Sequence, residues 1–460
     1  MRSRADVTAG EVPVDRDEAA RVAASVLDLE GADGVEVLVS ASTIGLTRYA
    51  LSEIIQNTVR KDVRAFVRVV VGDQVGSAST TQLTPVHLRR AADRALEAAR
   101  ASRPDVDFPG LPRPDEVGRA EPVFRWDEGT SRRTPAERAG RVREILSVSG
   151  ADNAAGIFET SAHSFAIHSS QGIDCYDAFT RCVTTCLVDT GEATGWGDAS
   201  SHSFDDVDVE AMARRSAAKA ARGAGARDAE PGTYEVVLEA AAAATLIDYL
   251  SYVGLGAKQV LEGESFLSTR TGEKIAADGI TIADDVWHPD SVGIGFDLEG
   301  VPKRRVDVIE RGVARGPVTD LRTAKKMGSE ATGHFSGSNE FGPYASNVVL
   351  EGGDRSLDEL ISAVDEGFLV TRFHYVNVLD RPATLLTGMT RDGTFRISGG
   401  EIGEPVHNFR FAQNVLEALG GTRGIGRDLA AFAPDYGSFG STVAPALHLG
   451  AFNFASTTSH

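Results

Sequence analysis

The sequence predicts an α+β protein with two domains. We expect an amino-terminal α/β domain with an antiparallel sheet and helices, and a carboxy-terminal β-rich domain that is barrel-like or built from two sheets. The chain has 460 residues, too many for one core at about 150 residues per domain. Helical and strand-like patterns alternate in the first half, whereas after residue 232 most segments are short, β-branched and separated by glycine. Because the run RGAGARDAEPG at 222–232 is typical of a linker, we place the domains at 1–228 and 229–460.

The first segments alternate between the helical and the strand periodicity. Residues 15–29 predict a helix and residues 35–40 a strand. In 64–71 (RAFVRVVV), every second residue is apolar, which predicts a strand with one buried face. The turn at 72–74 then leads into 75–80, so these two strands should form a β-hairpin.

Two helices with recognisable starts follow. Thr84 supplies an N-cap ahead of a proline, and apolar residues recur at helical spacing over 88–99. Thr134 and Glu137 have the spacing of a capping box at the start of the second helix. The proline-containing stretch 102–122 between the two helices predicts a surface connection.

Residues 154–201 alternate polar and apolar residues in three pieces, separated by Gly172 and Gly191. This pattern predicts an antiparallel meander. A helix is expected over 207–222, directly before the linker.

The second half begins with a β-branched strand at 234–238 that runs into an alanine-rich helix, in YEVVLEAAAAATLIDYLSYV. Shorter helices are predicted at 357–364 and 410–419, with Gly420 ending the latter. The remaining short β-branched segments favour a closed or two-sheet β architecture.

The composition argues against binding to several classes of partner. A formal net charge of −19 opposes binding to a phosphate backbone, so we expect no nucleic-acid partner. No stretch approaches the roughly 18 uninterrupted apolar residues of a membrane span. The amino terminus also has no apolar core after its arginines. We therefore expect a cytoplasmic protein without a membrane partner.

Common catalytic motifs are missing from the sequence. The glycine-rich stretch 420–426 does not complete GxGxxG, no GK[ST] follows it, and there is no GxSxG nucleophile elbow. Four acidic residues lie near one another in sequence, but acidic residues are abundant here and such groupings arise by chance. These residues are Asp284, Asp285, Asp290 and Asp297.

The cysteines do not form a recognisable metal or disulfide pattern. Cys175, Cys182 and Cys186 are odd in number and close in sequence, which fits neither a disulfide framework nor a paired zinc site. We interpret them as small buried hydrophobic residues on strands.

The histidines likewise have no zinc-peptidase spacing. Such an enzyme places two histidines and a glutamate on one helix, so that the imidazoles bind zinc and the carboxylate activates a water molecule. None of the ten histidines is followed by glutamate. Whether His288, His334, His374 and His407 converge in the second domain is left open by the sequence. No catalytic or metal-binding residue is assigned.

One polar group in the second domain is a candidate for binding a substrate or partner. Arg372, His374 and Tyr375 stand at the start of a strand-like run, and Arg391 follows in the next such run. The alternative interpretation is an ordinary polar cluster at the rim of a barrel.

Four segments together carry a family resemblance. They are VRAFVRVVVGDQVGSAST (63–80), YEVVLEAAAAATLIDYLS (234–251), EGFLVTRFHYVNVLDRPATLLTGMTRDGTFRISGGEIGEPVHNFRF (366–411) and APALHLGAFNFAS (444–456). In this order, the chain resembles the TldD/PmbA family and specifically its TldE (PmbA) branch. The succession of short motifs, rather than any one of them, makes the resemblance specific.

The resemblance implies a subunit of a heterodimeric TldD/TldE zinc metallopeptidase that cleaves unfolded peptides in an enclosed chamber. In the family the TldD subunit binds zinc through an HExxxH helix and a downstream cysteine. The corresponding positions here are Asp248, Tyr249 and Val253, and no cysteine follows Cys186. The resemblance therefore implies that this chain has no cofactor of its own, that zinc lies on the TldD-like partner, and that this subunit helps bind a peptide or peptide-like substrate.

Two alternatives remain open. The chain could be a stand-alone amide or conjugate hydrolase of a natural-product pathway, with a site rebuilt around Arg372, His374, Tyr375 and Arg391. It could also be a homodimer that binds peptides without cleaving them.

Overall fold

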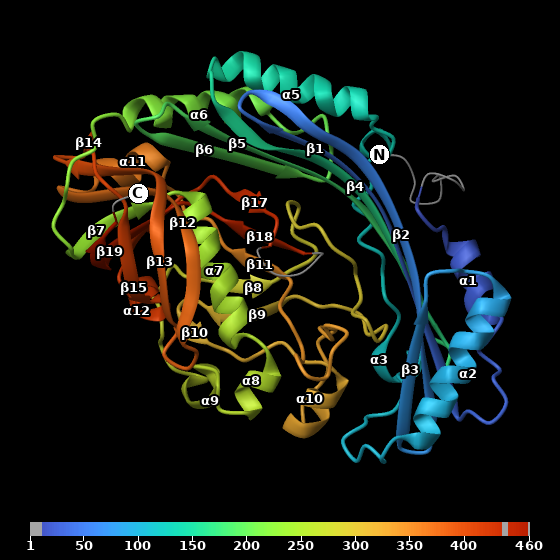
Figure 1. Ribbon diagram of the computed structural model, residues 1–460. Helices are drawn as coiled ribbons and strands as arrows, with labels where there is room; N and C mark the ends of the chain where they lie inside the picture. Colours follow the sequence, from blue (N-terminus) through green and yellow to red (C-terminus); the bar gives the residue numbers. More distant parts are fainter. Residues whose placement is uncertain (1–11, 435–439, 459–460) are drawn as a thin grey trace.

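The computed structural model describes residues 12–434 and 440–458, which form three β-sheets with helices around them (Figure 1). The first sheet has six antiparallel strands in the order β3-β2-β1-β4-β5-β6. All of these strands precede the predicted linker, and the other two sheets follow it. The strands are β1 (Gly34–Ala50), β2 (Glu53–Val71), β3 (Gln74–Thr80), β4 (Ala154–Ser169), β5 (Asp174–Asp189) and β6 (Thr194–Ser201).

The first sheet is strongly curved, and its long helices lie along the outer side (Figure 1). The predicted hairpin and meander are confirmed as β2–β3 and β4–β6. The predicted capping box is also confirmed, because the Thr134 side chain accepts the Glu137 N–H and the Glu137 carboxylate accepts the Thr134 N–H. The helices are α1 (Arg16–Ala24), α2 (Pro85–Ala101), α5 (Pro135–Ser149) and α6 (Val209–Arg222), with short α3 (Pro114–Val117) and α4 (Glu128–Ser131) between them.

Five strands of the second half close into a barrel, because β12 pairs with both β7 and β13 around the ring β12-β7-β19-β15-β13. β14 and β16 extend this sheet from β13 and β19. The predicted β-rich carboxy-terminal domain is thus confirmed. The strands are β7 (Gly232–Leu238), β12 (Glu366–Asp380), β13 (Leu385–Ser398), β14 (Glu401–Pro405), β15 (Phe409–Asn414), β16 (Thr422–Ile425) and β19 (Leu447–Thr457).

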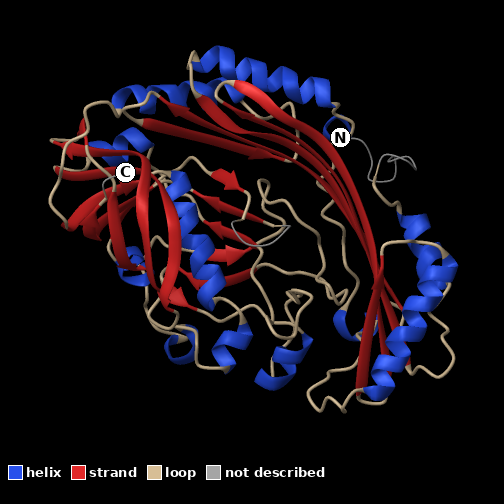
Figure 2. Ribbon diagram, in the orientation of Figure 1, coloured by secondary structure: helices blue, strands red, loops and turns tan. Residues whose placement is uncertain are grey.

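A second sheet of six strands, in the order β10-β9-β8-β11-β18-β17, lies between the barrel and the inner side of the curved sheet (Figures 1 and 2). The alanine-rich helix α7 (Ala240–Gly254) packs between this sheet and the barrel. The strands are β8 (Ile282–Asp284), β9 (Val306–Glu310), β10 (Val313–Ala314), β11 (Asn347–Leu350), β17 (Ala430–Phe432) and β18 (Ser441–Ala444). The remaining helices are α8 (Ala257–Leu261), α9 (Leu267–Arg270), α10 (Leu321–Met327), α11 (Leu357–Ser362) and α12 (Val415–Gly420).

The helix predicted over 410–419 is wrong in its first half. Residues up to Asn414 belong to strand β15, because Phe409 and Phe411 point into the barrel core while Arg410 is exposed. Asn414 then caps a short helix by accepting the Glu417 N–H at 3.0 Å. Gly420 is the last residue of this helix rather than the residue after it.

Within the described residues, no helix is both long and apolar enough to cross a lipid bilayer. The three cysteines are free and buried on β5, as the sequence analysis expected of small hydrophobic residues.

A buried ionic cluster joins the first sheet to a loop of the second half. The Arg68 guanidinium lies 3.5 Å from Glu36 Oε1 and 3.0 Å from Glu299 Oε1. Burial raises the pKa of Glu36 to about 7, although Arg68 opposes this shift. Ionisation of Glu36 therefore costs more free energy in the folded protein than in the unfolded chain.

The Glu36→Gln variant is expected to be more stable than the wild type by about 3 kcal/mol at alkaline pH and equally stable near pH 4. The sign follows from the raised pKa. Above about pH 4.5 the unfolded chain ionises Glu36 freely, whereas the folded protein resists ionisation until about pH 7. Urea unfolding across this range measures the effect, with Gln substituted at exposed Glu53 as the control. Equal stabilisation by Glu36→Gln at every pH would contradict the explanation.

Candidate functional site

A cleft lies between β6, the last strand of the first sheet, and β17, the last strand of the second. It consists of two adjoining cavities of about 560 and 210 Å³. The two cavities share Trp196, Asp198, Ala241 and Phe432 among their lining residues. In the described part of the chain no further strand pairs with the outer edge of β6 or β17, so main-chain edges border the cleft.

Two glycines orient strand β6 so that its polar side chains line the cleft. A Cβ atom at Gly195 would lie 2.0 Å from the Ser216 carbonyl oxygen, and one at Gly197 would lie 2.6 Å from Ser216 Oγ. Only glycine therefore allows α6 to pack so closely on this face of the strand. Because successive side chains alternate between faces, Trp196 and Asp198 are directed to the opposite face, where they line the cleft.

One face of helix α7 forms a wall of the cleft. Ala241, Ala244, Thr245 and Asp248 line the smaller cavity, and their spacing places them on the same side of the helix. Alanine has the highest helix propensity and leaves this wall smooth. The opposite side of α7 is packed in the core shared by the barrel and the second sheet.

The side chains at the implied HExxxH positions do not fit a zinc site. Asp248 accepts a hydrogen bond from Thr442 Oγ1 at 3.2 Å, and the Tyr249 hydroxyl donates to the Val376 carbonyl oxygen at 2.6 Å. Val253 is fully buried and has no atom that binds a metal. Across residues 12–434 and 440–458, no three His, Cys, Asp or Glu side chains gather as a metal site requires.

Charged groups from three elements surround Asp198. Burial raises the pKa of Asp198 to about 6, against the effects of Lys219, Arg215 and Arg372. Glu239, at the start of α7, forms an ion pair with Lys219. Arg372 approaches from β12. Asp198 is thus an acid that can gain or lose a proton near neutral pH inside the cleft.

The structure separates the four candidate residues into three places. Arg372 lines the cleft, stacks over the Trp196 ring at 4.1 Å and binds Asp392 through Nε at 2.5 Å. Arg391 also approaches Asp392, at 3.8 Å, but lines a different cavity. His374 and Tyr375 have ring centroids 4.5 Å apart, and neither lines the cleft.

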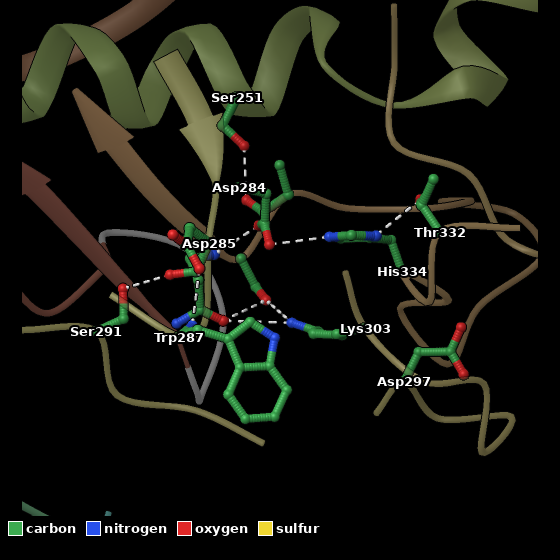
Figure 3. A network of polar contacts seen from close by, with 12 residues as sticks. Ser251, Asp284, Asp285, Trp287, Ser291, Asp297, Lys303, Thr332 and His334 are labelled. Atoms are coloured by element: carbon green, nitrogen blue, oxygen red, sulfur yellow. Dashed lines mark hydrogen bonds and ion pairs between the residues drawn. The ribbon is translucent and has the colours of Figure 1, made fainter. Parts of the chain in front are cut away.

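His334 belongs to a buried polar network rather than to a group of histidines (Figure 3). Its Nε2 lies 2.9 Å from Asp284 Oδ1, and its Nδ1 lies 2.9 Å from Thr332 Oγ1. Lys303 in turn donates to Asn347 Oδ1 at 3.2 Å. Although burial raises it, His334 and Lys303 lower the pKa of Asp284 to about 2. The network connects polar side chains of the second sheet with those of its loops.

His288, His374 and His407, whose convergence the sequence left open, do not join His334. His288 lies 3.9 Å from Asp290, the His374 ring lies beside that of Tyr375 at a tilt of 55°, and His407 is exposed. The acidic residues noted in the sequence are also divided among separate partners. Asp285 contacts Arg305, and Asp297 accepts the Phe335 N–H.

Sequence reasoning missed most of the residues that line the cleft. Trp196, Asp198 and Thr371 were not singled out, and neither was the pairing of His448 Nε2 with Glu235 at 2.5 Å. The alternation of glycine with larger residues in TGWGDASS was the one local signal for the cleft. It marks a strand that packs closely on one face only.

Comparison with protein families shows to which family this chain is related. A model of the PmbA/TldA metallopeptidase C-terminal domain matches residues 231–456, and one of PmbA/TldA metallopeptidase domain 1 matches residues 35–101. The chain belongs to the TldD/PmbA family. Its relatives include a protein named metalloprotease from Methanothermobacter thermautotrophicus, 28% identical over 79% of this chain and 81% of the relative. Metalloprotease PmbA of Escherichia coli O157:H7 is 24% identical over 86% of this chain and 88% of its own.

Among solved structures, the TldD/PmbA fold of this chain is similar to that of TldE from Thermococcus kodakarensis. The TM-score is 0.82 at 21% sequence identity, and the match covers 93% of this chain and 98% of the other. The fold is therefore TldE-like over nearly its whole length.

Proposed function

We propose that this TldD/PmbA family member is the TldE-like subunit of a heterodimeric TldD/TldE zinc metallopeptidase, with the zinc on a TldD-like partner. The proposal rests on the residues that occupy the HExxxH positions on α7. Asp248 and Tyr249 are engaged in hydrogen bonds within the fold, and Val253 has no metal-binding atom. A subunit with these side chains does not supply the Lewis acid or the general base of a zinc peptidase.

The second part of the proposal is that the cleft helps to bind an unfolded peptide or peptide-like substrate. An extended peptide can add to the outer edge of β6 by main-chain hydrogen bonds, which need no particular sequence. The two cavities provide room for side chains on the face that carries Trp196 and Asp198. Such binding would hold a peptide beside α7 while the partner performs the chemistry.

The alternative of a rebuilt hydrolase site has less support from the geometry. Arg372 and Arg391 are both directed to Asp392, whereas His374 and Tyr375 lie outside the cleft. A homodimer that binds peptides without cleaving them is retained as an outcome of the following test.

The test is to express this chain alone and together with a TldD/PmbA family member that contains HExxxH. We expect this chain alone to bind no stoichiometric zinc and to leave peptides intact. The complex should contain one zinc per heterodimer and cleave unfolded peptides, and replacing the glutamate of the partner's motif should abolish cleavage. Stoichiometric zinc on this chain alone, or cleavage by it alone, would contradict the proposal. Saturable peptide binding with no products even in the complex would favour the homodimer.

A further inference from the structure

Strand β13 has a β-bulge close to the cleft. In its pairing with β12, Asp392 and Gly393 together lie opposite the single residue Thr371. Asp392 has a φ of +57° and Gly393 a φ of +130°. This left-handed conformation is uncommon for residues other than glycine, so other contacts must stabilise Asp392 in it. Bulges redirect a side chain, and here the redirected group is a carboxylate.

The Asp392 carboxylate is buried and joins β13 to two other strands. Its Oδ1 accepts the Thr194 hydroxyl, at the start of β6, at 2.6 Å, and its Oδ2 accepts Arg372 Nε, on β12, at 2.5 Å. The side chain has no exposed surface. Asp392 and Arg391 line a neighbouring cavity, and Asp392 lines neither cavity of the cleft. Because removing a donor would leave a buried charge without its partner, Asp392 holds both donors in place.

Arg372 interacts with two acidic residues near the cleft. Its guanidinium forms an ion pair with Asp392 and lies 4.1 Å from the centre of the Trp196 ring. It also lines the smaller cavity, as Asp198 does. Burial raises the pKa of Asp198 to about 6, and the charge of Arg372 is one of those that oppose this shift. Arg372 is therefore close enough to be drawn to Asp198 if Asp392 loses its charge.

We propose that Asp392 is a positioning residue of the cleft, which holds Arg372 against Trp196 and so keeps the smaller cavity open for a side chain of the bound peptide. This inference rests on the proposed function of the cleft in peptide binding. Asp392 acts through Arg372 and Thr194, since it lines neither cavity of the cleft itself. Without the charge of Asp392, the guanidinium should move toward Asp198 and occupy part of the cavity of about 210 Å³.

The first experiment follows the fluorescence of Trp196 in the full chain, with the other two tryptophans, Trp126 and Trp287, replaced by phenylalanine. In Asp392→Asn the indole ring should lose its contact with Arg372. Acrylamide should therefore quench the emission faster than in the parent protein. Unchanged quenching would contradict the proposal.

The pH dependence of the same emission reports on Asp198, which lies two residues from the tryptophan on the same strand. The emission of the parent protein should titrate near pH 6. In Asp392→Asn the midpoint should shift to lower pH, because Arg372 then stabilises the ionised carboxylate. Asp380→Asn is the control, since Asp380 on β12 is exposed, and it should leave the midpoint unchanged. The other charged and titratable groups around Asp198 are the same in these variants, namely Arg215 and Lys219 on α6, Glu239 at the start of α7, and His202, Asp206 and Asp290 in the adjoining loops.

The second experiment measures binding of a fluorescently labelled, unstructured peptide of glycine, serine, alanine and one phenylalanine to the full chain, alone and in its heterodimer. We expect Asp392→Asn to weaken binding about tenfold, because Arg372 then blocks the smaller cavity. The double variant Asp392→Asn/Arg372→Ala should recover the lost affinity, since it no longer contains the blocking side chain. Phe368→Leu is the matched control, because it destabilises the barrel without changing a residue that lines the cleft.

These variants separate positioning of Arg372 from a general loss of stability. If the ion pair only stabilised the fold, the double variant would bind no better than Asp392→Asn, and Phe368→Leu would also lose affinity. Either result would overturn the inference while leaving peptide binding in place. Failure of the peptide to bind the wild type would instead contradict the proposed role of the cleft, and the fluorescence of Trp196 would still test the position of Arg372.

Discussion

Replacing Asp177 with alanine is expected to lower the free energy of unfolding by about 4 kcal/mol, because several buried N–H groups lose their acceptor. Asp177 lies on β5 with no exposed surface. Its two carboxylate oxygens accept the N–H groups of Val123 at 2.9 Å, Phe124 at 3.0 Å and Gly295 at 2.8 Å. The side chain therefore joins the first sheet to a connecting segment and to a loop of the second half.

Urea unfolding at neutral pH, followed by circular dichroism, measures this effect. Asp177→Asn should cost less than Asp177→Ala, because an amide oxygen still accepts hydrogen bonds and burial already raises the pKa of Asp177 to about 6. Asp174→Ala is the matched control, since Asp174 on the same strand is exposed and should change stability by less than about 0.5 kcal/mol. A loss below about 1 kcal/mol for Asp177→Ala would show that the backbone groups find other partners.

Phe368→Ala is expected to destabilise the protein by about 4 kcal/mol, through lost apolar burial and the cavity left in the barrel. Phe368 on β12 has no exposed surface. Its ring lies edge to face with Tyr234 at 4.9 Å and with Phe409 at 5.2 Å between centroids. These rings come from three strands of the barrel, so the loss should affect closure of the whole ring of strands.

The same unfolding measurement tests this expectation, with two further variants. Phe368→Leu should cost less than alanine because it leaves a smaller cavity. Phe66→Ala is the control, since Phe66 on β2 is 40% exposed. Similar losses for Phe66→Ala and Phe368→Ala would contradict the assignment of Phe368 to the barrel core.

Local patterns in the sequence correctly predicted elements that bury one continuous face. Helix α2 has its predicted apolar stripe from Leu88 to Ala99 buried against the first sheet, and Thr134 forms the predicted capping box. The mistake over 410–419 has the opposite cause. The alternation of Phe409 and Phe411 is too short to indicate a strand next to the helix that follows. Only packing in the barrel core determines that these residues form a strand.

The sequence by itself determined the α+β fold, because this depends on residue type and local order along the chain. It also determined which residues stand at the positions that the family resemblance assigns to HExxxH. The tertiary structure alone decided where the cleft forms. Trp196, Asp198, Ala241 and Thr371 come from β6, α7 and β12, and they meet only because the curved sheet packs against the barrel and the second sheet. The packing of whole helices and strands brings together residues that are far apart in the chain. Local periodicity in the sequence does not report this packing.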